Sequence, residues 1–306
     1  ELVSYFPGPL QKSYSEFMPQ HRLAREIIAT LVTNSMVNRM GPVFAYRTRD
    51  ETGADLASVA RAYSIAREVF DIRSLWSAIE SLDNDVHANA QYSMMNRTRR
   101  LLKHGTHWFL DRPALIDDIA AAVDCFAPAT KQLTESMAEH LQGREHRSFT
   151  ESQVLYREIG IPDKVAERMA GLHAMHSTLD IVEVAQAVDT SPERVAKTYF
   201  ILGEKLGLHW LRDQVERLGV SGRWQAMARN SMRENLYYLQ GQLARQALEE
   251  AGPRRSPENA MKAWSEARGK RLSHVEEILN EMRSIGGMDF PTLSVSIQEV
   301  RRLSQS

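Results

Sequence analysis

The chain has 306 residues, of which 43% are hydrophobic and 25% are charged, a mixture typical of globular proteins rather than of disordered ones. Its 38 Lys and Arg residues nearly balance its 39 Asp and Glu residues, so no net field attracts nucleic acid or anionic lipid. Cys125 is the only cysteine, which excludes an internal disulfide and is typical of the reducing cytoplasm. Because Cys125 follows the apolar run Ile119 to Val123, we expect its thiol to be buried and structural.

Neither a membrane span nor a signal peptide is predicted. No apolar stretch approaches the roughly 20 residues that would cross a bilayer. The segment Glu1 to Pro7 lacks the basic start and the apolar core of a signal peptide. A first residue of Glu rather than Met predicts that the chain is a piece of a longer protein.

Apolar residues recur at three- and four-residue steps in almost every segment, and alternating β-branched runs are nearly absent. The sequence therefore predicts an all-α, multi-helix bundle with no Rossmann unit. The main predicted helices cover His21 to Met40, Asp55 to Phe70, Ser74 to Leu110, Trp224 to Glu250, Pro257 to Ile285 and Thr292 to Leu303.

Helix boundaries follow from local signals. The pairs Gly41-Pro42 and Arg112-Pro113 predict helix ends, because proline cannot donate a helical hydrogen bond and disfavours a helical residue before it. Capping boxes at Ser148 to Glu151 and Thr190 to Glu193 predict helix starts, and Ser256-Pro257 predicts another. We expect residues 1–306 to form one helical domain, with a break near 111–113 into two packed subdomains as the alternative.

One segment resembles a helix-turn-helix. In Leu179 to Val195 a small Ala185 allows two helices to approach each other, and a DNA-binding version would place Glu193, Arg194 and Lys197 near the major groove. The turn carries Asp189 where glycine is usual, and the second helix has no basic stripe. A plain pair of antiparallel helices is favoured, with DNA or regulator binding as the alternative.

Motifs for catalysis or cofactor binding were not found. The glycine triplet of a dinucleotide fold is missing, and Gly203 and Gly207 fit at most a helix-packing pattern. His104 with His107, and His173 with His176, have the three-residue spacing of some metal ligands, but no third ligand follows. We expect surface or helix-end histidines, and no catalytic, cofactor-binding or metal-binding residue in this chain.

The remaining charged groups are read as surface or docking features. Pairs of carboxylates such as Glu249-Glu250 and Glu276-Glu277 are typical of solvated helix faces, since no pocket is predicted that would shift their pKa values. The basic runs Arg97 to Arg100 and Arg254-Arg255 are typical of solvated surface or of domain docking. Polar side chains around the first helix are numerous enough to dock on another domain, and helix capping and packing within the chain are favoured over direct contact with substrate: His21, Arg22, Arg25, Asn34, Asn38 and Arg39.

Several blocks in order along the chain resemble the C-terminal part of the large bacterial NAD-specific glutamate dehydrogenases. The first block is the most specific of them. The blocks are His21 to Thr30, Asn34 to Gly41, Glu51 to Ala54, Ala60 to Tyr63, Arg67 to Phe70, Leu75 to Asp83, Leu179 to Ala185, Trp210 to Arg212 and Arg223 to Arg229.

The resemblance implies a helical C-terminal segment that supports the catalytic lobes or assists assembly. In that family the glutamate- and NAD-binding lobes precede this region, and the intact enzyme oxidises L-glutamate to 2-oxoglutarate and ammonia as NAD is reduced. The implied cofactor is NAD for the intact enzyme, with none bound to this chain. The implied partners are the upstream catalytic domain and further copies of the enzyme, without membrane or nucleic acid. A stand-alone helical scaffold remains a third alternative.

Overall fold

The computed structural model describes residues 2–305, and within this range the chain is helical and contains no strand. None of these helices combines the length and the apolar character needed to cross a membrane. The first half contains α1 (Leu2–Tyr5), α2 (Gly8–Tyr14), a 3₁₀ turn η1 (Met18–Gln20), α3 (Ala24–Met40), α4 (Phe44–Thr52), α5 (Leu56–Val69), α6 (Ile72–Glu80), α7 (Ala88–Leu110), α8 (Pro113–Ile116), α9 (Ile119–Glu135) and α10 (Met137–His140). The second half contains α11 (Gly143–Glu158), α12 (Asp163–Met175), α13 (Thr178–Ala187), α14 (Pro192–Leu206), α15 (Leu208–Arg217), α16 (Arg223–Ala251), α17 (Pro257–Ala267), α18 (Gly269–Ser284) and α19 (Phe290–Leu303).

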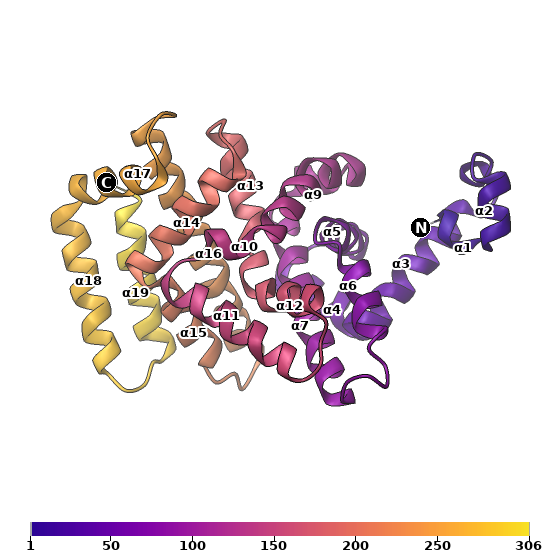
Figure 1. Cartoon of the computed structure of the whole chain (residues 1–306), viewed down its shortest axis with the longest axis horizontal. Helices are drawn as coiled ribbons and strands as arrows, with labels where there is room; N and C mark the ends of the chain where they lie inside the picture. The colour runs from indigo at the N-terminus through magenta and orange to yellow at the C-terminus, as the bar shows by residue number, and fades with distance from the viewer. Residues whose placement is uncertain (1, 306) are drawn as a thin grey trace.

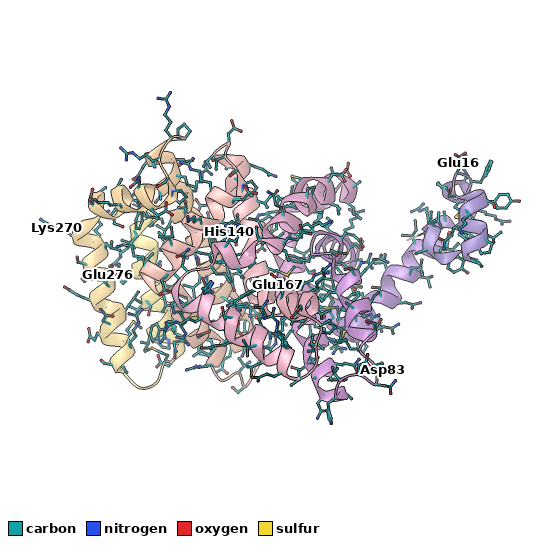
Figure 2. The ribbon with its side chains drawn as sticks, in the orientation of Figure 1. Glu16, Asp83, His140, Glu167, Lys270 and Glu276 are labelled. Atoms are coloured by element: carbon teal, nitrogen blue, oxygen red, sulfur yellow. The ribbon has the colours of Figure 1, made fainter. Side chains whose placement is uncertain are left out.

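The helices form an elongated body with an arm at one end (Figure 1). The arm consists of residues 2–40, in which α1, α2 and η1 sit at the far end of α3, away from the body. The hairpin of α18 and α19 closes the opposite end, so Glu16 on the arm and Lys270 on α18 mark the two extremes of the molecule (Figure 2). The all-α prediction is confirmed for the described residues.

The body has two clusters of buried apolar side chains. The larger cluster runs from Met36 to Phe200 and also includes Ala244 and Leu248 on α16. The smaller runs from Leu202 to Leu303. Both α14 and α16 contribute to each cluster, so these two helices join the halves of the body. The predicted break near 111–113 lies inside the larger cluster, and the division into subdomains stays a prediction.

Local signals determine several helix boundaries. Asp55 caps α5 by accepting a hydrogen bond from the backbone N–H of Ser58 at 2.9 Å, and Ser256 caps α17 in the same way through Asn259 at 3.3 Å. Gly41 ends α3 with a φ of +94°, which an L side chain rarely adopts. The single long helix predicted for Trp224 to Glu250 is confirmed as α16.

Two long helices predicted from the sequence are each divided in two. The stretch Ser74 to Leu110 is broken between α6 and α7, where short polar side chains compete for the backbone and Asn84 takes a left-handed φ of +69°. The stretch Pro257 to Ile285 is broken at Arg268. That guanidinium donates to both carboxylate oxygens of Glu250, at 2.9 and 2.6 Å, and stacks over Trp264. The contact of Arg268 with Glu250, on another helix, favours a kink that the local sequence does not predict.

Both predicted capping boxes need correction. Ser148 to Glu151 lies in the interior of α11, where Thr150 donates to the carbonyl of His146 instead of capping a helix. The start of α11 is stabilised from outside, because a carboxylate oxygen of Glu204 on α14 accepts the backbone N–H of Arg144 at 3.2 Å. The second box begins one residue too early, since Ser191 rather than Thr190 caps α14.

The expectation of a buried Cys125 is wrong, because the residue is exposed. The buried face of α9 is formed by Ala122, Phe126, Thr130 and Leu133, which repeat at three- and four-residue steps. Cys125 lies outside this stripe, and the side-chain amide of Gln186 lies 3.0 Å from its sulfur.

Candidate functional site

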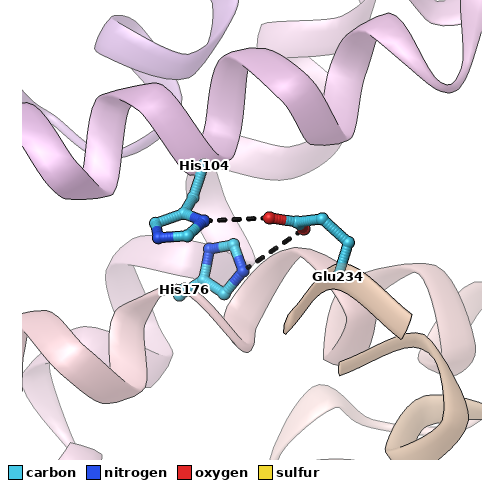
Figure 3. A group of neighbouring side chains, drawn as sticks. All are labelled: His104, His176 and Glu234. Carbon is cyan, nitrogen blue, oxygen red and sulfur yellow. Dashed lines mark hydrogen bonds and ion pairs between the residues drawn. The ribbon is translucent and has the colours of Figure 1, made fainter. Parts of the chain in front are cut away.

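Three helical segments meet in the body and bring together His104, His176 and Glu234. His104 lies in the C-terminal half of α7, His176 directly follows α12, and Glu234 lies in the first half of α16. The Nδ1 atom of His104 is 3.0 Å from Oε1 of Glu234, and Nε2 of His176 is 3.8 Å from Oε2 of the same carboxylate. Both rings therefore face one carboxylate, as Figure 3 shows. One potential ligand atom from each residue lies within 4.8 Å of the other two.

His176 is the most enclosed member of this cluster. The residue is only 4% exposed, and within residues 2–305 neither of its ring nitrogens has a hydrogen-bond partner. Its ring packs against His104, with centroids 4.4 Å apart, and edge-on against Tyr237 at 4.2 Å. Burial lowers the pKa of both histidines well below the ordinary value, so both rings are neutral at pH 7. Neutral imidazoles with unused nitrogens are the form in which histidine binds metals.

The cationic neighbours of the cluster have carboxylate partners of their own. Arg233 donates to Glu216 at 2.9 Å and lies 3.4 Å from Glu234. Lys103 lies 3.3 Å from Glu51. Glu234 therefore shares Arg233 with a closer carboxylate.

A cavity of about 1110 Å³ borders the cluster on one side. Asp111, Asp180 and Glu183 line it next to Arg112, and Trp224, which is 76% exposed, also contributes. We call it the acidic cavity, because its carboxylates outnumber its arginines. These carboxylates are Glu51, Asp111, Asp180, Glu183 and Glu234, against Arg112 and Arg245.

Asp180 is the most strongly perturbed carboxyl group of the acidic cavity. Burial raises its pKa to about 7, although Trp108 donates to its Oδ1 at 2.8 Å and Arg112 lies near. The guanidinium of Arg112 stacks on Trp108 at 3.6 Å and donates to both oxygens of Glu183, at 2.5 and 2.7 Å. Because Arg112 is engaged by Glu183, Asp180 is left with one neutral donor and an Oδ2 that has no partner within residues 2–305.

A second cavity, of about 500 Å³, borders the other side of the cluster and is lined by His104, His173 and His176. We call it the basic cavity, because six cationic side chains line it and only one carboxylate does. These are Arg97, Arg100, Lys103, Arg212, Arg229 and Arg233, against Glu216. The predicted basic run Arg97 to Arg100 thus forms part of a cavity wall.

Comparison with known proteins identifies the chain. A family model described as "Glutamate dehydrogenase, C-terminal" matches residues 1–302. The chain belongs to this family. The NAD-specific glutamate dehydrogenase of Halomonas elongata is 37% identical over 304 residues, which are 98% of this chain and 19% of that protein. The corresponding proteins of Pseudomonas aeruginosa and Mycobacterium tuberculosis are 31% and 28% identical, over 100% of this chain and 19% of their own length.

The family resemblance predicted from the sequence blocks is therefore confirmed. The glutamate dehydrogenase C-terminal domain described here spans 19% of the length of these relatives. No glycine lines either cavity, and none of the described residues 2–305 lies in a strand. That no residue of this domain is catalytic or holds a cofactor stays a prediction.

The histidines do not pair as their spacing suggested. His107 faces Glu51, with Nε2 3.5 Å from its Oε2, and lines the acidic cavity, whereas His173 is exposed. His176 does lie at a helix end, but His104 lies in mid-helix with only 16% of its side chain exposed. The third member, Glu234, is 130 residues from His104 along the chain, and no local spacing could have revealed it.

The helix-turn-helix resemblance describes an ordinary helix pair. In α14, Val195 and Tyr199 are fully buried, and Lys197 pairs with Glu258 of α17 at 2.8 Å. Arg194 donates to the backbone carbonyls of Gly252 and Arg255. Asp189, at the position where glycine is usual, takes a left-handed φ of +50°. A recognition helix must present side chains to a groove, and α14 uses these residues to pack against α13, α16 and α17.

Proposed function

We propose that this domain docks on the catalytic part of an NAD-dependent glutamate dehydrogenase and supports its assembly. In this proposal the intact polypeptide oxidatively deaminates L-glutamate to 2-oxoglutarate and ammonia as NAD is reduced. The glutamate- and NAD-binding lobes belong to the much larger part of the polypeptide that this domain does not cover. Three relatives named NAD-specific glutamate dehydrogenase, each about five times longer than the matched segment, support this function. The proposed compartment is the cytoplasm, and the proposed assembly is a homo-oligomer.

The observation that carries the docking role is the arm. Eight of the twenty-one exposed large apolar side chains lie in residues 2–40. Only Leu2, Met18 and Met36 are buried there. Phe17 is 64% exposed and Tyr14 is 55% exposed. The eight are Val3, Tyr5, Leu10, Tyr14, Phe17, Leu23, Ile28 and Val37.

Such a density of exposed apolar side chains marks an interaction surface, because water-facing apolar patches favour association. The arm projects from the body, and of the apolar side chains in residues 2–40 only Met36 and Met40, at its base, pack in the core clusters, so its far end can reach a neighbouring domain (Figure 1). The proposed occupant is the catalytic part of the same polypeptide, because the relatives are about five times longer than the matched segment.

The test replaces two apolar side chains of the arm in the intact enzyme, as the double variant Tyr14→Ser/Phe17→Ser. We expect docking of the domain to weaken by at least about tenfold, since buried aromatic residues carry much of the energy of an interface. Measured quantities are glutamate-dependent NAD reduction, the sedimentation coefficient and hydrogen exchange in residues 2–40. The double variant Val154→Ser/Leu155→Ser on α11 is the matched control, because these side chains are also exposed but lie on the body.

Fast arm exchange in the wild-type enzyme, with unchanged activity and sedimentation in the arm variant, would contradict the docking role. Loss of the oligomer with wild-type activity per protomer would assign the arm to a second copy instead of the catalytic part. The isolated 306-residue chain is expected not to reduce NAD with glutamate, and measurable turnover by it would contradict the placement of the active site elsewhere.

A further inference from the structure

We propose that His104, His176 and Glu234 form a binding site for a zinc-type dication, which ties α7, α12 and α16 together. This proposal departs from the sequence-based expectation that the chain holds no metal. It does not depend on the proposed docking role, since all three residues lie in the body. It rests on the geometry, the unused nitrogens and the local charge of the cluster.

The ligand set suits zinc. Zn²⁺ is bound in proteins by imidazole nitrogen and carboxylate oxygen, and two histidines with one glutamate are a known three-ligand set. Tetrahedral coordination at the usual Zn–N and Zn–O lengths requires ligand atoms roughly 3.3 Å apart. His104 Nδ1 lies 3.0 Å from Oε1 of Glu234 and His176 Nε2 lies 3.8 Å from its Oε2, so each imidazole is near this spacing from a different oxygen of the same carboxylate. Since all three atoms lie within 4.8 Å, small rotations of the rings would complete the set.

The unpaired nitrogens of His176 give a second, independent reason. A buried polar atom without a partner costs free energy, so most such atoms in folded proteins are satisfied by protein, water or a ligand. A hydrogen bond joins Nδ1 of His104 to Oε1 of Glu234, but within residues 2–305 the ring nitrogens of His176 have no hydrogen-bond partner. A metal ion bound by His104, Glu234 and Nε2 of His176 would give this nitrogen a partner.

The surrounding packing holds the rings in place for this role. His176 is sandwiched between His104 and Tyr237, and Tyr237 lies three residues after Glu234 on the same side of α16. The three ligands come from separate helical segments, so metal binding would couple their positions. His176 thus has few alternative orientations, which lowers the entropy cost of binding.

Local charge permits a dication. Of the six cations that line the basic cavity, Arg233 and Lys103 each have a carboxylate partner outside the cluster, Glu216 and Glu51 respectively, and Arg233 also lies 3.4 Å from Glu234. The carboxylate of Glu234 supplies the negative charge of the site. Three protein ligands leave a fourth position open, and the basic cavity, which His104 and His176 also line, has room for water or a small anion there.

The experiment counts metal in the intact protein. The protein is stripped with a chelator, dialysed against Zn²⁺ or Co²⁺ and analysed by elemental mass spectrometry. We expect the wild type to bind one more metal ion per chain than the Glu234→Gln variant or the His104→Gln variant binds. A loss of affinity of at least about 10- to 100-fold is expected, because even second-shell changes reduce affinity by that factor.

The matched control is His146→Gln, which removes an exposed histidine of α11 that lines neither cavity and should retain this metal ion. Thermal unfolding of each variant without metal shows whether it is folded. Added Zn²⁺ should raise the melting temperature of the wild type and of the control, but not that of Glu234→Gln. In the wild-type protein, bound Co²⁺ should show the visible absorption of a four-coordinate site with nitrogen and oxygen ligands.

Equal stoichiometry in wild type and Glu234→Gln would overturn the proposal, as would no binding above the buffer blank. A near-ultraviolet charge-transfer band typical of thiolate ligation would also overturn it, because that band would place the metal at Cys125.

Discussion

The arm and the body use the same residue types in opposite ways. In the arm, aromatic and aliphatic side chains such as Tyr14 and Phe17 are exposed. In the body, aromatic rings are buried and even charged groups are enclosed: Arg212 on α15 is 2% exposed and Asp180 on α13 is 4% exposed. The body is thus enclosed by its own contacts, whereas the apolar surface of the arm is exposed, as the proposed docking requires.

Replacement of a buried arginine should give the largest difference in stability between a change in the body and a change in the arm. Arg212 donates to Glu145 at 2.7 Å and to Gln240 at 2.6 Å, and it stacks over Tyr237. Arg212→Ala leaves Glu145 buried without its cation, which should lower the free energy of unfolding by about 3–5 kcal/mol. Urea unfolding followed by tryptophan fluorescence measures this loss.

The control for that change is Arg22→Ala in the arm. Arg22 is exposed, so its removal should change stability by no more than about 0.5 kcal/mol. Equal effects of the two variants would show that the arm is as strongly held by this chain as the body is.

The next largest effect is a pH dependence that belongs to the body alone. Burial raises the pKa of Asp180 from 3.8 to about 7, so the folded state favours the protonated carboxyl more than the unfolded state does. Its contribution to stability is therefore complete below pH 3.8 and is lost as the pH rises towards 7 and above. At 1.36 kcal/mol for each pKa unit, the full loss is at most about 4 kcal/mol.

Asp180→Asn should remove this dependence, because asparagine remains neutral and can still accept the Trp108 hydrogen bond through its oxygen. Urea unfolding of wild type and variant at a series of pH values from 4 to 8 gives the comparison. The variant should be the more stable one at pH 8. If the two pH profiles run parallel, the carboxyl of Asp180 is not the group that titrates.

How far the sequence predicts this molecule depends on the range of the signal. Asp55, Gly41 and Ser256 act on neighbouring residues, and the boundaries that they predict are confirmed. The kink at Arg268 and the start of α11 depend on Glu250 and Glu204, which lie on other helices, so their local sequence suggested a different structure. The cluster of His104 and Glu234 has the same origin, since helix packing alone brings together two residues 130 positions apart.

The smallest expected effect concerns how closely helices approach. Gly203 on α14 faces Gln240 on α16, and a Cβ added at Gly203 would lie 2.5 Å from the side-chain nitrogen of Gln240. That amide donates to the carbonyl of Tyr199 at 2.8 Å, while its oxygen accepts from Arg212. Gly203→Ala should therefore displace Gln240 and cost about 1–3 kcal/mol by overpacking, despite the better helix propensity of alanine.

Gly8→Ala in the arm is the matched substitution. A Cβ at Gly8 meets nothing within 4 Å, and Pro9 offsets the conformational gain by disfavouring a helical alanine before it, so stability should change by no more than about 0.5 kcal/mol. Thermal unfolding of both variants measures the contrast. A stabilised Gly203→Ala protein would mean that α14 and α16 can separate without loss, and the two halves of the body would then be less tightly joined than their shared core indicates.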